Sequence, residues 1–150
     1  MAIVLPKFPR RGLSGRIPTA NQYKPAIMIR LVGLQPCYEP NETLEFEYRL
    51  GRWACDKVTA IETSVVWYTE GKGTEDLGVH FFERNSGQTV AQRDWQAAQH
   101  IETKLPAAPL SYEGRLLKIR WSIRVRAFLN DGTELIAQQP FYLGSLTREV

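Results

Sequence analysis

The feature that most constrains this chain is an alternation of apolar and polar residues from Leu117 to Ala127, within positions 115–129. A helix repeats about every 3.6 residues and would scatter these two sets, whereas a β-strand places them on opposite faces. We therefore expect a strand with one apolar face and one cationic face. The apolar set is Leu117, Ile119, Trp121, Ile123, Val125 and Ala127, and the set between is Lys118, Arg120, Ser122, Arg124 and Arg126.

The same period of two occurs in two earlier segments, whose apolar positions are Ile27, Ile29 and Leu31, and then Leu44, Phe46, Tyr48 and Leu50. Residues 57–70 and 77–83 are rich in Val, Thr and aromatic residues, which favours two further strands. Asn130-Asp131-Gly132 predicts a tight hairpin turn between the 115–129 strand and a last strand over 133–143. Residues 90–100 are compatible with a short helix and equally with a Gln-rich strand.

These segments amount to about seven short strands separated by turn residues, without a long helix, which is the pattern of two packed antiparallel sheets. The predicted fold class is all-β, a single antiparallel β-sandwich of immunoglobulin type. A chain of 150 residues with 43% hydrophobic residues fits one such domain, which we assign to residues 26–150.

Residues 1–25 contain four of the nine prolines, show no apolar period, and carry five Lys and Arg without an acid. We expect an extended basic arm. Because the whole chain has a net charge of +3, the remainder has 3 − 5 = −2, which argues against a nucleic-acid footprint on the domain. The arm offers positions for docking on its own sandwich or on a neighbouring copy: Ile3, Leu5, Phe8, Arg10, Arg11, Leu13 and Arg16.

Two cysteines, Cys37 and Cys55, are the only thiols, and the N-terminus lacks the pattern of a secretion signal. No stretch approaches the roughly 18 apolar residues of a membrane span. The expected location is the cytoplasm with reduced thiols, although a disulfide between the two cysteines stays open.

The segment Leu-Pro-Ala-Ala-Pro-Leu-Ser-Tyr-Glu-Gly at 105–114 leads directly into the long alternating strand. A proline-rich loop that ends in glycine before such a strand resembles the hallmark of arrestin-fold domains, and residues 64–70 and 140–144 suit that family. The resemblance covers residues 26–144 and implies a scaffold or adaptor role. Family arrestins pair two sandwiches, whereas this chain has room for one, and no equivalent of their phosphate-sensing elements is recognisable.

Candidate catalytic groups are few, because the chain has only two histidines, His80 and His100. A metal site built from these histidines with Cys37 and Cys55 would lack the close ligand spacing of a zinc site. The segment Gly-Lys-Gly-Thr at 71–74 lacks the earlier glycine of a phosphate-binding loop. We therefore expect no catalytic residue, no metal and no cofactor, and predict that the chain is not an enzyme.

The cationic strand face is the candidate surface for a protein partner, through Lys118, Arg120, Arg124 and Arg126. The alternative is that these cations pair across strands with Glu62, Glu70 and Glu134. If unpaired, they could dock an acidic segment such as the strand face of Glu45 and Glu47 in another copy. The hypothesis from the sequence is a non-enzymatic protein-binding scaffold, with a self-assembling structural subunit as the first alternative and an enzyme with an unrecognised site as the second.

Overall fold

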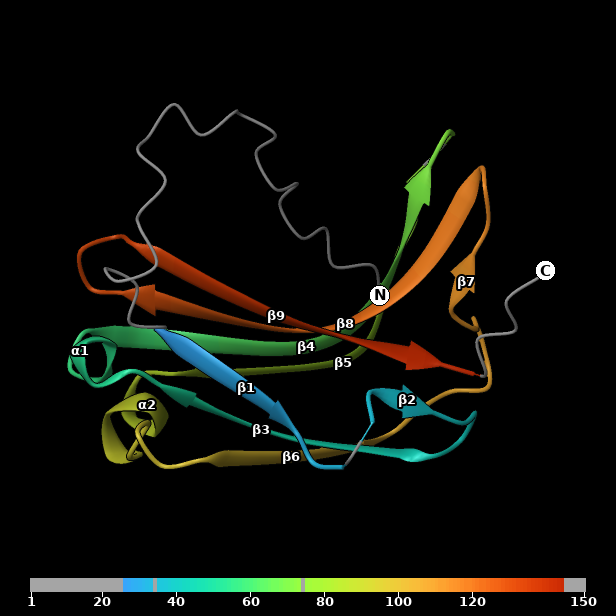
Figure 1. Ribbon diagram of the computed structural model, residues 1–150. Coiled ribbons are helices and arrows are strands. Elements are labelled where there is room, and N and C mark those ends of the chain that lie inside the picture. Colours follow the sequence, from blue (N-terminus) through green and yellow to red (C-terminus); the bar gives the residue numbers. More distant parts are fainter. Residues whose placement is uncertain (1–25, 34, 74, 145–150) are drawn as a thin grey trace, which may run out of the picture.

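The computed structural model describes residues 26–33, 35–73 and 75–144, and most of this part of the chain is β-strand (Figure 1). The strands are β1 Ile27–Leu31, β2 Cys37–Tyr38, β3 Thr43–Leu50, β4 Val58–Gly71, β5 Leu77–Ser86, β6 Gln99–Lys104, β7 Tyr112–Glu113, β8 Leu117–Leu129 and β9 Glu134–Leu143. Two short helices, α1 Arg52–Cys55 and α2 Gln88–Gln92, lie at the same end of the molecule. No helix in the described ranges is long and apolar enough to cross a membrane.

Two sheets make up the fold. The small sheet has the order β1-β3-β6, and the large sheet has the order β2-β9-β8-β4-β5, with β7 added beside β8. Neighbouring strands are antiparallel except the short β2, which runs parallel to β9. The prediction of an all-β sandwich is confirmed.

Strand β8 has the alternation expected from the sequence. Trp121, Ile123 and Val125 are buried between the sheets, and β8 forms the predicted hairpin with β9. The hairpin turn is stabilised by Asp131, whose carboxylate accepts the backbone N–H of Thr133 at 2.9 Å. The centre of the alternation therefore lies with its apolar side chains in the core, whereas Leu117 is exposed at one end and Ser122 and Arg124 of the opposite face are buried as well.

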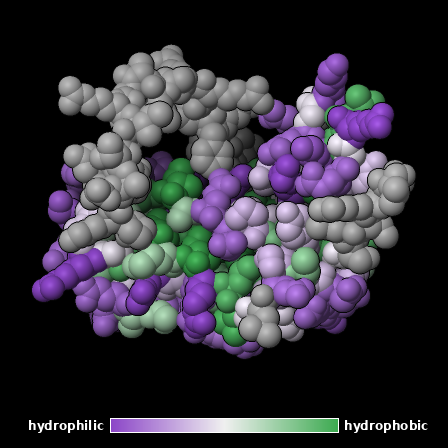
Figure 2. Space-filling model, in the orientation of Figure 1, coloured by the Kyte–Doolittle hydropathy of each residue, from purple (hydrophilic) through white to green (hydrophobic). Residues whose placement is uncertain are grey.

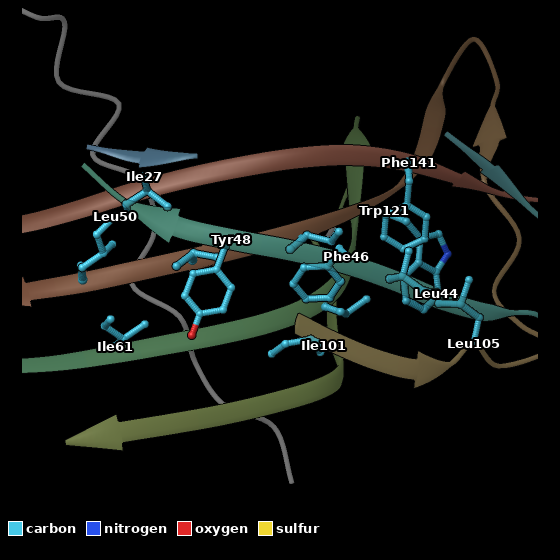
Figure 3. Packing of buried hydrophobic residues seen from close by; sticks show 14 of the residues in the cluster. Ile27, Leu44, Phe46, Tyr48, Leu50, Ile61, Ile101, Leu105, Trp121 and Phe141 are labelled. Atoms are coloured by element: carbon cyan, nitrogen blue, oxygen red, sulfur yellow. The ribbon is translucent and has the colours of Figure 1, made fainter. Parts of the chain in front are cut away.

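Packing between the sheets centres on the Trp121 ring, which lies 5.8 Å from the Phe141 ring. Its indole Nε1 donates to the carbonyl of Pro109 at 2.8 Å, so the polar atom of the side chain is satisfied. Leu44 and Phe46 of β3 are fully buried in the same cluster, as Figure 3 shows. Each such side chain stabilises the fold by roughly 1.5–3 kcal/mol, so this cluster dominates the free energy of unfolding.

The sequence left open whether residues 90–100 form a helix or a strand. In the structure, residues 88–104 contain both. Helix α2 is followed by a turn and then by β6. The turn is organised by Trp95, which is buried, stacks on Tyr48 at 6.4 Å and donates its Nε1 to the carbonyl of Val90 at 2.8 Å. The conformation of this segment depends on the long-range packing of one indole and not on a periodic pattern. Residue propensities for helix or strand carry no signal of such packing.

Replacing the central indole should reveal how much it stabilises the sandwich. We predict that Trp121→Ala lowers the free energy of unfolding by about 3–5 kcal/mol, because it leaves a cavity and an unpaired carbonyl. Urea unfolding followed by circular dichroism measures this. The matched control is Trp53→Ala, since Trp53 is 45% exposed on α1 and its loss should cost far less. Equal effects for the two variants would contradict a core built on Trp121.

Candidate metal centre

The outer face of the small sheet carries alternating polar residues as a direct consequence of its buried inner face. On β3 the core residues Leu44 and Phe46 leave Glu45 and Glu47 pointing outward, and on β6 the buried Ile101 leaves His100 and Glu102 outward. The antiparallel register places Glu45 directly opposite Glu102, and Glu47 directly opposite His100. One imidazole and three carboxyl groups therefore occupy two rows of the ladder that are neighbours on the outer face.

The imidazole of His100 lies between two carboxylates. Its Nε2 is 3.1 Å from Glu45 Oε1 and 3.2 Å from Glu102 Oε1, and its Nδ1 is 3.9 Å from Glu47 Oε1. All of these groups are partly exposed to solvent. Nε2 carries at most one hydrogen in either protonation state, and that hydrogen cannot be directed well at two oxygens. A cation between the three groups would instead contact the nitrogen and both oxygens at once.

Charge in the cluster is only partly compensated by the protein. Arg30 donates to the Glu47 carboxylate at 2.6 Å, and this hydrogen bond holds the pKa of that carboxyl below its usual value. Within the part of the chain that the structure describes, no arginine pairs with Glu45 or Glu102, and two like charges directly opposite on an antiparallel pair destabilise it. A positive group between them would relieve that repulsion.

Glu45, His100 and Glu102 each present one ligand atom, and these atoms all lie within 4.8 Å of one another. The sequence did not predict this cluster, because His100 was considered as a metal ligand only together with His80, Cys37 and Cys55. The signal was the pair of alternating patterns, Glu-x-Glu at 45–47 and His-x-Glu at 100–102. Neither pattern has zinc-site spacing by itself, and only the β3–β6 register brings them together.

The other residues of that earlier metal hypothesis have structural roles elsewhere. His80 on β5 lies within 2.7 Å of the Lys104 carbonyl through its Nε2, and its ring packs edge-on against Trp121 at 6.1 Å. Cys37 and Cys55 are both free thiols. Cys55 lies 3.4 Å from the Gly51 carbonyl through its sulfur, and burial raises its pKa.

The cationic face of β8 is largely engaged within its own sheet. The ion pairs join Arg120 to Glu70 at 2.9 Å and to Glu113 at 3.5 Å, Lys118 to Glu113 at 3.8 Å, and Arg126 to Glu134. Glu62, which was expected to pair with this face, binds Arg84 of β5 at 2.7 Å instead. Pairing through Glu70 and Glu134 agrees with the alternative that the sequence left open.

Arg124 differs from its neighbours on that face because it is only 9% exposed. Its guanidinium lies 5.3 Å above the Tyr68 ring, and burial lowers its pKa. A protein-binding role for Lys118, Arg120, Arg124 and Arg126 stays a prediction. The docking positions expected in the arm, from Ile3 to Arg16, lie outside the described residues.

Comparisons with known proteins show likeness in fold only. No protein-family model and no curated protein matches the chain. Among solved structures, Spo0M, a sporulation control protein from Bacillus subtilis, aligns with a TM-score of 0.46 and 8% identity over 81% of this chain and 51% of Spo0M. The chain thus spans about half the length of Spo0M.

Two further solved structures are similar to a lesser degree. A superoxide reductase (neelaredoxin) from Ignicoccus hospitalis aligns with a TM-score of 0.45 and 8% identity, over 79% of this chain and 80% of that one. A β-glucosidase from Listeria innocua aligns with a TM-score of 0.34 and 13% identity, over 79% of this chain and 16% of that one. These alignments are to β-sandwich-like folds and carry no activity over to this chain.

The prediction of a non-enzymatic scaffold or adaptor requires correction. The chain was expected to be a non-enzymatic scaffold or adaptor, with a self-assembling subunit as the alternative, and similar folds that are named as enzymes contradict the exclusion of catalysis. The physical reason is that a sandwich only positions side chains, and chemistry depends on what is grafted onto it. A search of the sequence for known catalytic or metal-ligand spacings could not find a cluster of side chains that two separate strands bring together.

The repulsion between the opposed carboxylates predicts a measurable effect on stability. In chelator and in buffer alkaline enough to leave imidazole rings neutral, Glu102→Gln should raise the free energy of unfolding by roughly 0.2–1 kcal/mol. Urea unfolding measures the difference. Glu39→Gln, in an exposed turn without a carboxylate opposite on a neighbouring strand, should change stability less. A destabilised Glu102→Gln would instead mean that the contact of Glu102 with His100 outweighs the repulsion from Glu45.

Proposed function

We propose that this domain binds a divalent transition-metal ion through Glu45, His100 and Glu102. The observation that carries the proposal is the position of His100 Nε2, which lies 3.1 Å from one carboxylate oxygen and 3.2 Å from the other. The residues come from two neighbouring strands of a sheet whose other face is buried in the core, so the backbone that presents them is well supported.

Ligand spacing supports a metal ion of the zinc class. Two ligand atoms bonded to one ion at about 2.1 Å are about 3.0 Å apart at right angles and about 3.4 Å apart at the tetrahedral angle. The two nitrogen–oxygen separations of 3.1 and 3.2 Å lie between these limits. The two carboxylate oxygens lie within 4.8 Å of each other, so the carboxylates would also have to come within ligand spacing of each other around the ion.

The donor set selects the class of ion. One imidazole nitrogen with two carboxylate oxygens suits Zn²⁺, Mn²⁺ or Fe²⁺ better than Ca²⁺ or Mg²⁺, which prefer oxygen ligands alone. Three protein ligands leave coordination positions open for water or a small substrate. Such an ion acts as a Lewis acid and lowers the pKa of its bound water, so the site has the means for hydrolytic chemistry.

Calorimetric titration of the tag-free, chelator-treated chain with Zn²⁺ and Mn²⁺ tests the proposal. We expect one ion per chain, and at least about tenfold weaker binding for His100→Gln and for Glu102→Gln, since losing even an outer partner of a ligand typically costs 10–100-fold. Binding should also weaken as the pH falls, because protons compete with the metal for the imidazole.

Glu39→Gln is the matched control, because it removes the same charge from an exposed position outside the cluster. Its affinity for Zn²⁺ should equal that of the unmodified chain. Two results would refute the metal centre: no saturable binding to the unmodified chain, or equal affinity in all three variants. In the first case the His100 cluster is a set of ion pairs only.

We also propose that the sandwich is of the arrestin type, as the proline-rich segment suggests. Supporting contacts tie that segment to the large sheet: Pro109 accepts from Trp121 Nε1 at 2.8 Å, and Ser111 Oγ accepts the backbone N–H of Leu143 at 2.8 Å. An experimental structure superposed on arrestin domains would decide the family, independently of the metal site.

A further inference from the structure

One end of the large sheet extends beyond the rest of the sandwich. The pairing of β8 with β9 stops at Trp121 opposite Phe141, whereas β8 and β4 continue together to Leu117 opposite Gly71. Figure 1 shows the end of β4 and the start of β8 rising away from the other strands. We call residues 70–73 and 112–118 the distal tip.

Apolar side chains are concentrated at the distal tip. Leu116 is 71% exposed, Tyr112 is 50% exposed and Leu117 is 38% exposed. In Figure 2 hydrophobic surface is visible at this projecting end, with strongly hydrophilic surface around it. Leu116 has the highest exposure among the large exposed hydrophobic residues of the described chain, and its position at a projecting end calls for a physical explanation.

Backbone contacts hold the exposed leucines in place. The Lys72 N–H donates to the Leu116 carbonyl at 3.2 Å, and the Gly114 N–H donates to the Leu117 carbonyl at 3.0 Å. Gly71 has a φ of +142°, and a Cβ there would lie 2.1 Å from the Leu116 carbonyl oxygen, so only glycine permits this approach. The fold therefore fixes Leu116 at the apex instead of letting the loop collapse onto the domain.

Cations flank the exposed leucines. Glu70 and Glu113 form ion pairs with Arg120, and Glu113 also pairs with Lys118. No ion pair within the described ranges engages Lys72 or Arg115, the cations next to Leu116 in the two halves of the tip. An apolar apex with free cations beside it has the chemistry of a surface that enters the boundary between lipid headgroups and acyl chains.

We propose that the distal tip docks on the surface of a lipid bilayer that contains anionic headgroups. Leu116 and Leu117 enter the acyl boundary, Tyr112 lies at headgroup level, and Lys72 and Arg115 contact lipid phosphates. A projecting apex suits a fluid bilayer, which closes around any convex shape, whereas a protein partner would need a matching pocket. The small-sheet metal centre lies on the opposite layer and plays no part in this contact.

Co-sedimentation of the full chain with vesicles tests the proposal. We expect binding to vesicles of phosphatidylcholine with 30 mol% phosphatidylserine, a composition of about one anionic lipid in three, and weaker binding to phosphatidylcholine alone. Leu116→Ser should lower the partition coefficient on the mixed vesicles by about tenfold. Because Leu116 is largely exposed, this variant should keep the native circular dichroism spectrum.

Ile136→Ser is the matched control, since Ile136 is 44% exposed on β9, outside the distal tip, and its loss should leave vesicle binding unchanged. The arm carries five cations of its own and could attract anionic vesicles. The Leu116→Ser variant distinguishes binding through the distal tip from attraction through the arm. If it binds vesicles as well as the unmodified chain does, the proposal is overturned and the attraction comes from cations elsewhere. A full chain that stays in solution with mixed vesicles would also overturn it.

Discussion

The antiparallel ladder between β4 and β8 is the constraint on which the rest of the structure depends. It extends from Val58 opposite Leu129 to Gly71 opposite Leu117 and forms the middle of the large sheet. A register slip of one residue would turn the guanidinium groups of β8 into the core and its Trp and Ile side chains into water. Burying an arginine without a partner costs several kcal/mol, so this single pairing fixes which face of the large sheet receives the small one.

The small sheet follows from that choice. Its inner residues, Leu44 and Phe46 among them, pack on the face that β8 provides, and their burial forces the residues between them outward. The cluster around His100 is thus a consequence of core packing on the opposite side of the same strands. The register of β3 and β6 then places Glu45 directly opposite Glu102, and this pair of carboxylates is unfavourable unless a positive group lies between them. Core packing and site electrostatics are linked through two strands.

The distal tip arises from the same ladder by a different route. β4 and β8 continue together past the end of the β8–β9 pairing, and at the turn beyond them apolar side chains such as Leu116 stay in water. Tight backbone contacts at Gly71 prevent the loop from folding back. Strand length therefore explains both the stable centre of the domain and its exposed hydrophobic end.

The sequence by itself determined the strands and the faces of the longest of them, because a period of two is a local property that survives without knowledge of neighbours. It identified Trp121 as core, the hairpin at Asp131 and the acidic alternation at Glu45 and Glu47. Beyond that hairpin it could not determine which strands pair or in what register, since those depend on contacts distant in the chain. Tertiary structure alone therefore placed His100 between two carboxylates, buried Trp95 in a segment without a pattern, and left Arg124 covered rather than free.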